Sequence, residues 1–352
     1  MGIFKSLVVK ETLHVVRDKR TVLITLLMPL VLLVLFGFAI STEVNNIRVV
    51  AVVDRHTQET RQMLQQLIVN EYLSFEGLTS HSEVEELLKT GKADAAVYLH
   101  DDNGKISSQI VVDASNPNLA QTYAVYIQGA MAGNLDGPVL THTLYNPQLK
   151  SAYNFVPGVM GMIFILVCAI MTSVSIVSEK QSGTLSLLIV SPIKPRTIIF
   201  GKLVPYFILS CILLAIMLTM SYTVLGLPFS ANFLNVVLIT LVYIILALSI
   251  GLLVSTLVDT QVSALLVSAV IFMLPVILLS GMIFPIDNMP RVLQWFSCII
   301  PARWYIEAMR KLMVQDLALS YVWSELVILA GMTVVVLGIA VKKFQTPSNK
   351  IC

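Results

Sequence analysis

Long uncharged stretches alternate with short charged segments along this chain. Five stretches contain no Asp, Glu, Lys or Arg: residues 21–42, 151–178, 203–258, 260–286 and 326–341. Crossing the hydrocarbon core of a bilayer takes roughly 20 apolar residues. The stretch 203–258 is long enough for two crossings, and the Gly- and Pro-containing segment 226–232 interrupts it. The pattern therefore predicts six transmembrane helices, the first at 21–42 and the others within 153–343.

Residues 43–152 have a different pattern, in which short periodic runs alternate with Asn, Asp and Gly. Runs of β-branched residues predict strands, and runs with apolar residues on one side predict amphipathic helices. A Ser-x-x-Glu sequence beginning at Ser82 is typical of a helix start. Alternating β and α elements imply a small sheet with helices packed on it, so we expect an inserted α/β domain. The expected elements are strands at 47–53, 95–99 and 106–112 and helices at 58–73, 82–88 and about 116–134.

The composition agrees with a membrane protein, because 56% of the residues are hydrophobic and only 12% are charged. A soluble protein needs more charge on its surface. The net charge of +2 says little, but Lys5, Lys10, Arg17, Lys19 and Arg20 all precede the first crossing. Cytoplasmic segments carry an excess of Lys and Arg. We therefore expect a multi-pass protein of the cell (inner) membrane with both termini in the cytoplasm, the tail at 344–352 included, and with the α/β domain outside.

Residues 1–20 intersperse apolar side chains such as Leu7 and Val8 with basic ones, which is typical of an amphipathic helix on the inner membrane surface. A plain solvated helix is the alternative. The first crossing could also be a cleaved signal peptide, since Ala39-Ile40-Ser41 loosely resembles a cleavage site. Its apolar run is longer than a signal peptide has, so we expect it to stay as a membrane anchor.

The residue pattern gives little support to cofactor or metal chemistry. The His residues are widely spaced without a metal-ligand pattern, and no cysteine framework occurs in the outer domain. No Gly-x-x-x-x-Gly-Lys-Ser/Thr loop occurs either, so we expect that this chain binds no cofactor, does not hydrolyse ATP and is not itself an enzyme. The predicted crossings also lack the buried charges of a proton relay, which disfavours a secondary transporter, and lack the paired side chains of an intramembrane enzyme.

The most informative segment is 179–196, which joins the second and third crossings on the predicted cytoplasmic side. It begins with the charged pair Glu179-Lys180, passes through Gly183 and ends its apolar part at Ser191-Pro192. A Gly hinge followed by a short amphipathic helix that Pro terminates makes an element that can lie across the inner membrane surface. Either a partner protein pushes on this element, or it is a plain connecting loop.

The sequence Glu-Lys-x-x-Gly-Thr-Leu-x-x-Leu-x-x-Ser-Pro, followed by Gly201-Lys202, resembles the signature of ABC-2 type permeases, the membrane-spanning subunits of ABC exporters. Residues 280–290 and 300–305, with Arg310, resemble the same family, and so do the turns at Val53-Asp54 and 113–116. The resemblance implies that segment 179–196 docks on a separate ATPase subunit, which carries the ATP and Mg. The residues to which it assigns ATPase coupling are Glu179, Lys180, Gly183, Thr184, Leu185, Leu188, Ser191 and Pro192.

The resemblance also implies that residues 284–310 dip into the outer leaflet as a re-entrant helical hairpin and return without crossing. This accounts for a basic segment on the outer side, and its Pro residues break the helix where such a dip requires a break. The competing topology is a seventh crossing at about 284–300, which would move the C-terminus outside. The residues assigned to the hairpin are Phe284, Pro285, Pro290, Pro301, Arg303, Trp304 and Tyr305.

The expected fold is therefore an α-helical polytopic membrane protein with six transmembrane helices, an inserted extracytoplasmic α/β domain and an outer-leaflet re-entrant hairpin. The expected function is that of a permease subunit of an ATP-driven ABC-2 exporter, which moves a lipophilic or amphiphilic substrate such as a drug-like molecule or a lipid. Its expected partners are an ABC ATPase, a second copy or a paralogous permease, a periplasmic adaptor and the lipid bilayer, but no nucleic acid. The alternative is a membrane-anchored sensor or scaffold that uses the α/β domain to bind a ligand or partner.

Overall fold

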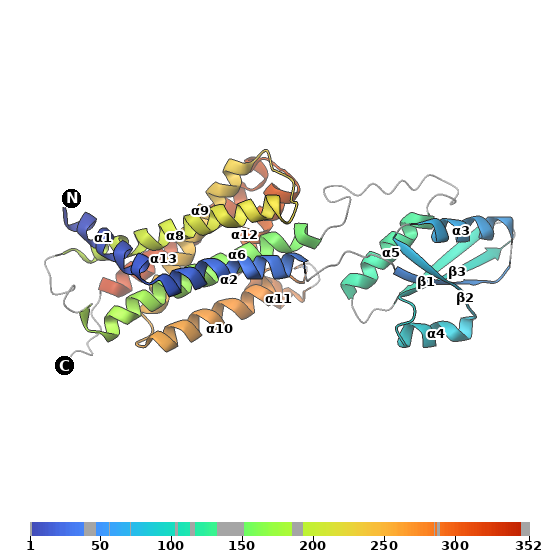
Figure 1. The fold of residues 1–352 in the computed structure, drawn as a ribbon, viewed down its shortest axis with the longest axis horizontal. Helices are drawn as coiled ribbons and strands as arrows, with labels where there is room; N and C mark the ends of the chain where they lie inside the picture. Colours follow the sequence, from blue (N-terminus) through green and yellow to red (C-terminus); the bar gives the residue numbers. More distant parts are fainter. Residues whose placement is uncertain are drawn as a thin grey trace. The chain divides into compact units, whose positions relative to one another are not determined.

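The computed structural model of the chain divides into two units, Met1–Ile40 with Ser151–Cys352 and Ser41–Lys150. We call them the helical unit and the α/β unit and describe each by itself (Figure 1). The structure describes residues 2–38, 47–55, 57–70, 72–102, 105–112, 117–131, 151–184, 193–284, 286 and 289–345.

The helical unit contains the long apolar helices that the hydropathy pattern predicts. Five of its helices are long and apolar enough to cross a membrane, and a sixth crossing results if the pair α1 and α2, which is bent by 66°, is taken as one span. The elements are α1 (Gly2–Arg17), α2 (Lys19–Phe38), α6 (Ser151–Gln181), α8 (Pro195–Thr223), α9 (Phe233–Ser255), α10 (Gln261–Leu279), α11 (Arg291–Ile299), α12 (Pro301–Met309), the π-helix η3 (Arg310–Val314), the 3-10 helix η4 (Leu319–Tyr321) and α13 (Trp323–Gln345).

Helix α6 forms the centre of the helical unit and packs against α2, α9, α10 and α12. Small residues allow this close approach, since a Cβ on Gly251 of α9 would lie 2.6 Å from the Ala169 carbonyl oxygen of α6. Two buried rings join α9 to α12, because Tyr243 and Tyr305 stack with 4.2 Å between their centroids. The Tyr243 hydroxyl then donates to the Gly161 carbonyl of α6 at 2.9 Å. These contacts hold α6, α9 and α12 together as one core.

Several helix ends meet at the end of the helical unit where α1 lies, which we call the α1 end (Figure 1). Ile176 near the end of α6, Ile199 near the start of α8 and Leu252 near the end of α9 form one buried apolar cluster, and Phe344 of the last helix packs against it. The first helix and the C-terminal end of the last helix of this unit therefore lie at the same end. This agrees with an even number of crossings.

Helices α11 and α12 are short and are joined at Ile300 toward the opposite end, which we call the hairpin end. Pro290 precedes α11, and Pro301 is the first residue of α12, where a proline fits because its missing N–H would have no helical partner. The nine residues of α11 extend about 14 Å, which is less than half of the hydrocarbon thickness of about 30 Å. The helix that the structure describes within 284–300 is therefore too short for a seventh crossing.

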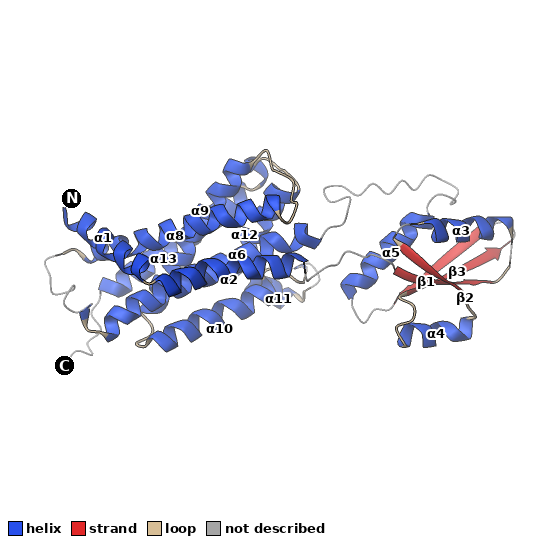
Figure 2. Cartoon of the chain, viewed as in Figure 1, coloured by secondary structure: helices blue, strands red, loops and turns tan. Residues whose placement is uncertain are grey.

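The α/β unit has a four-stranded sheet in the order β2-β1-β3-β4 (Figure 2). Strand β1 pairs in parallel with β2 and β3, and β3 pairs antiparallel with β4. Helices α3 and α5 pack on one face over a shared apolar cluster, and α4 packs on the other face over a second cluster. The elements are β1 (Ile47–Val53), α3 (Gln58–Val69), β2 (Leu73–Leu78), α4 (His81–Lys89), β3 (Ala95–Asp102), β4 (Lys105–Val112) and α5 (Pro117–Met131).

Two sequence expectations about this unit are wrong. The helix start expected at Ser82 lies two residues earlier, because Ser80 is the N-cap of α4 and forms the capping box with Glu83. The helix expected at 58–73 ends at Val69, and the strand β2 follows where none was predicted. Strand β2 contains Ser74, Glu76 and Gly77 in place of a β-branched run, and its register against β1 shifts between Val49 and Val50. It lies at the edge of the sheet and pairs on one side only, so weak strand propensity suffices there.

Candidate coupling site

Glu179, in the last turn of α6, is bound from two sides at the α1 end. Its Oε1 accepts a hydrogen bond from the Lys10 ammonium of α1 at 2.8 Å. Its Oε2 lies 2.6 Å from the Lys202 ammonium of α8. The carboxylate that opens the predicted coupling segment therefore joins α6 to both α1 and α8.

Lys202 itself is fully buried, with only 1% of its side chain exposed. Its ammonium also donates to Glu11 Oε1 at 3.0 Å, and the Glu11 side chain is 2% exposed. Lys10 completes the group at 3.4 Å from the same Glu11 oxygen. Lys10, Glu11, Glu179 and Lys202 thus form a network with two positive and two negative charges, which we call the charge network. Removing one member of a buried ion pair leaves an uncompensated charge and is strongly destabilising.

Gly201, beside Lys202, explains how α1 approaches α8 so closely. A Cβ at this position would lie 2.4 Å from Leu7 Cδ2, which is too short for two carbon atoms. Leu7 is buried against α8 as a result. The Gly-Lys pair that follows the coupling segment therefore has two structural tasks, because the glycine admits α1 and the lysine binds it.

The next two residues of α6 bind a different element, the turn between α9 and α10. Lys180 forms an ion pair with Asp259 and donates to the Val258 carbonyl at 3.1 Å. The Gln181 side-chain oxygen accepts from the backbone N–H of Gln261, the first residue of α10, at 3.2 Å. Three successive residues of α6 therefore connect to α1, to α8 and to the α9–α10 turn.

Gly183 ends the helical course of α6 with a φ of +74°, a left-handed conformation that glycine adopts without strain. A Cβ at Gly183 would meet nothing within 4 Å, so the requirement for glycine there is conformational. The Thr184 hydroxyl donates to the Glu179 carbonyl at 3.3 Å. Four further residues predicted for this site, Leu185, Leu188, Ser191 and Pro192, lie outside the described residues.

Four of the residues predicted for the hairpin, Pro301, Arg303, Trp304 and Tyr305, lie on α12, and Pro290 immediately precedes α11. Arg303 donates to the Gln294 carbonyl at 3.1 Å, and its guanidinium lies 4.9 Å from the centroid of the Trp304 ring. The Trp304 N–H donates to the Cys298 carbonyl at 3.0 Å. Tyr305 points inward to stack on Tyr243, and Phe284 is exposed. Pro285 lies outside the described residues.

Sequence reasoning did not assign a site role to Lys10, Glu11 or Asp259. Lys10 binds the predicted residue Glu179 and Asp259 binds the predicted residue Lys180, whereas Glu11 joins the charge network through Lys10 and Lys202. Lys10 and Glu11 are separated from their partners in α6 and α8 by more than 160 residues, and no local periodicity reports such a pairing. Two features of the sequence could have indicated these residues. Glu11 is a carboxylate within a helix otherwise rich in Lys, Arg and apolar residues, and Asp259 is a single charge between two apolar helices.

A second set of charges missed by sequence reasoning lies at the hairpin end. Lys311 of η3 binds Glu325 of α13 at 2.6 Å and Glu307 of α12 at 3.2 Å. Burial lowers the pKa of Lys311, but its hydrogen bonds and charge interactions with these two carboxylates outweigh burial and raise the pKa above the ordinary value. Arg310 donates to the Gly281 carbonyl at 2.7 Å, just beyond the end of α10.

A comparison with protein families decides what this arrangement belongs to. The family described as ABC-2 family transporter protein matches residues 19–342, which is most of the chain. The chain belongs to the ABC-2 family. The resemblance seen in the segment 179–202 is thereby confirmed, and the long apolar helices of the helical unit are those of a multi-pass ABC-2 membrane protein.

Relatives of this ABC-2 protein have names that concern transport. The protein named probable multidrug ABC transporter permease YbhS of Escherichia coli (strain K12) is 28% identical over 88% of this chain and 87% of its own length. The probable multidrug ABC transporter permease YbhR of the same organism is 29% identical over 91% of this chain and 92% of its own length. ABC transporter G family member 20 of Dictyostelium discoideum is 27% identical over 57% of this chain and 28% of its own length. None of these names describes a sensor or a scaffold, so the alternative function gains no support.

Proposed function

We propose that this chain is the permease subunit of an ATP-driven ABC-2 exporter and that a separate ATPase subunit, which holds the ATP and Mg, docks at the α1 end. The observation that carries the proposal is the position of Glu179 and Lys180. These two residues connect the end of α6 to α1, to α8 and to the α9–α10 turn through ion pairs. A force applied at the start of the coupling segment therefore reaches four elements at once.

The proposed mechanism is a rigid-body movement driven from the α1 end. Closure of the ATPase subunits on ATP moves the segment 179–192, and the ion pairs carry α1, α8 and the α9–α10 turn along with α6. The helical unit then changes from inward-open to outward-open. The proposed coupling residues are Glu179, Lys180, Gly183, Thr184, Leu185, Leu188, Ser191 and Pro192, with Lys10, Glu11 and Lys202 as positioning residues.

In this proposal the α1 end is cytoplasmic and the hairpin end faces outward. Basic residues on α1 and in the last turn of α13 support this orientation. The α/β unit is then extracytoplasmic, and α11 with α12 forms a hairpin in the outer leaflet. Val292, Trp295, Phe296 and Ile299 support the hairpin placement, because their apolar side chains are all more than half exposed and suit a lipid environment.

The proposed substrate is lipophilic or amphiphilic. Small polar side chains inside the helical unit bind one another, as Ser173 and Ser268 do at 3.1 Å and Cys168 and Ser210 do at 3.2 Å. These groups therefore serve helix packing and are not free to bind a polar substrate. The two Escherichia coli relatives that match over most of this chain are named multidrug permeases, which supports a drug-like or lipid-like cargo.

We propose further that two permease subunits assemble in the membrane, either two copies of this chain or this chain with a paralogue. Within one copy, only 17% of the apolar 18-residue stretch of α10 and of α13 is buried, whereas 67% of the corresponding stretch of α6 and of α9 is buried. Part of that open surface suits a second permease, and the remainder faces lipid. A periplasmic adaptor at the α/β unit would continue the export route through an envelope.

The test is to reconstitute the chain with its ATPase and to measure substrate-stimulated ATP hydrolysis and transport. We expect Glu179→Gln and Gly183→Glu to leave the ATPase active but to abolish its stimulation by substrate, with assembly weakened in Gly183→Glu. Ser320→Glu, in the exposed η4 helix at the hairpin end, is the matched control and should behave as the parent. Full stimulation and transport in both coupling variants would refute the assignment.

A further inference from the structure

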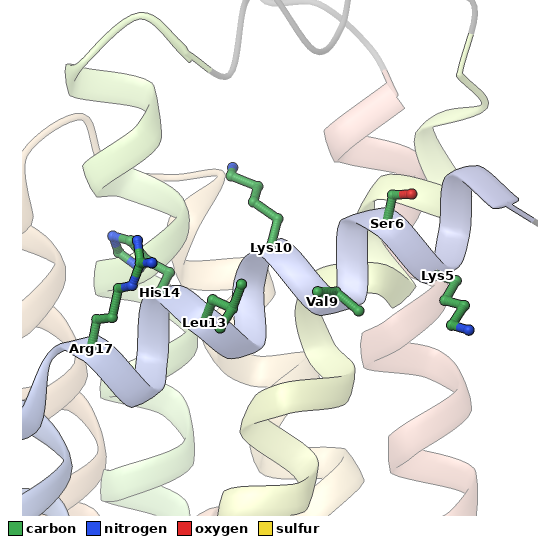
Figure 3. Close-up of a pocket in the computed structure, with 7 residues that line it drawn as sticks. All are labelled: Lys5, Ser6, Val9, Lys10, Leu13, His14 and Arg17. Atoms are coloured by element: carbon green, nitrogen blue, oxygen red, sulfur yellow. The ribbon is translucent and has the colours of Figure 1, made fainter.

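An open groove of about 640 Å³ runs along the outer face of α1. Figure 3 shows the residues that line it, all of them on α1. Val9 and Leu13 occupy its middle, and both are about half exposed. Basic residues surround this apolar centre, with Lys5 at one end, Arg17 and His14 at the other and Lys10 between them.

The charge on this face is unbalanced. Glu11, the only acidic residue of α1, is buried on the opposite side and bound to Lys202, and Lys10 is bound to Glu179. Lys5 and Arg17 form no ion pair with any residue that the structure describes. The groove therefore combines an apolar floor with two free cations, which is the pattern of a surface that binds an anionic amphiphile.

The position of α1 favours a lipid as the occupant. Helix α1 is followed directly by the apolar helix α2 and meets it at a bend of 66°, so α1 lies across the end of a membrane-spanning element. Ile3, Phe4 and Val16 of α1 are exposed as well, which extends the apolar surface beyond the groove. An acidic protein surface would match the cations but would leave these apolar side chains in water.

We propose that the groove on α1 binds anionic phospholipids of the inner leaflet, with one phosphate at Lys5, another at Arg17 and acyl chains along Val9 and Leu13. This inference rests on the proposed function in one respect, the cytoplasmic placement of the α1 end. It adds a consequence for coupling, because α1 is bound to α6 and α8 through the charge network. A lipid that holds α1 in place stabilises the arrangement on which the coupling segment depends.

The experiment uses the full chain without ATPase or nucleotide, so its outcome does not depend on coupling. A tryptophan introduced as Val9→Trp reports on lipid at the groove, and subtraction of the parent removes the signal of the three native tryptophans, Trp295, Trp304 and Trp323. The probes are brominated phosphatidylglycerol and brominated phosphatidylcholine, which quench tryptophan on contact. We expect the anionic lipid to be preferred, with the preference reduced by added salt.

Replacing the free cations should remove the preference. Each Lys or Arg near an anionic membrane surface accounts for about fivefold in affinity, so Lys5→Gln with Arg17→Gln should abolish most of the selectivity for phosphatidylglycerol. Lys5→Arg with Arg17→Lys should retain it, and Lys343→Gln, an exposed cation in the last turn of α13, should leave it unchanged. Equal quenching by the two lipids in the Val9→Trp chain that retains Lys5 and Arg17 would overturn the proposal. A preference for phosphatidylglycerol that survives loss of both cations would overturn it as well.

Discussion

The two ends of the helical unit hold their charged residues in different ways. At the α1 end, Glu179 and Lys202 connect α1, α6 and α8 through ion pairs between oppositely charged side chains. At the hairpin end, Arg303 and Arg310 donate to backbone carbonyls of neighbouring segments. Among the described basic residues of that end, Lys311 alone binds carboxylates, on α12 and α13. The ion pairs at the α1 end join three helices to one another, as the proposed movement of that end as one piece requires, whereas the arginines of the hairpin end fix local turns.

The largest effect should come from the centre of the charge network. Lys202→Met removes the buried cation and leaves Glu11 buried without its main partner, so we expect a loss of about 3–5 kcal/mol in stability. The measurement is thermal unfolding of the purified chain in detergent, with Lys343→Gln as the exposed control. Adding Glu11→Gln should restore much of the loss because the uncompensated charge is then gone. A single variant as stable as the parent would show that the two buried charges are not coupled.

A smaller effect is expected at the hairpin end. Arg310→Gln removes the hydrogen bond to the Gly281 carbonyl and leaves no buried carboxylate unpaired, so we expect a loss of about 1.5–3 kcal/mol. The same unfolding measurement applies, and Arg291→Gln at the exposed start of α11 is the control. A loss of stability as large as that of Lys202→Met would remove the contrast between the two ends. Arg310 would then make a stabilising contact beyond its hydrogen bond to the Gly281 carbonyl.

The sequence predicts the parts of this protein that depend on local composition. Uncharged stretches locate α6, α8, α9, α10 and α13, since a crossing helix cannot expose charge to lipid. Short, largely apolar runs between Asn, Asp and Gly residues locate β1, β3 and β4. The edge strand β2 escaped because Ser74, Glu76 and Gly77 give it a weak strand pattern, and pairing with β1 supplies what its own sequence lacks.

The candidate site was predictable only in part for a related reason. The motif at 179–196 predicts a docking segment, but it does not predict what anchors Glu179, because Lys10 and Lys202 come from helices distant in the sequence. Burial of Lys202 is equally invisible in the sequence, since a lysine near the start of an apolar helix is normally exposed. The charge network depends on how α1 crosses α8, and this crossing is a product of tertiary packing at Gly201.

Gly201 therefore provides the subtlest test of the comparison. Gly201→Ala places a methyl group where Leu7 lies and should push α1 away from α8, at a cost of about 1–3 kcal/mol from overpacking. Gly331→Ala in α13 is the matched control, because a Cβ there meets nothing within 4 Å and alanine favours a helix. Combining Gly201→Ala with Leu7→Ala should restore the approach of α1, although burial of Leu7 is lost. Cross-linking between cysteines introduced at Ser6 of α1 and at Ile193, two residues before α8, would measure that approach directly, because these residues line one pocket and lie outside the charge network. A lower yield is expected in Gly201→Ala alone. An unchanged yield in that variant would mean that the charge network holds α1 without help from the glycine contact, so that ion pairs alone would distinguish the α1 end from the hairpin end.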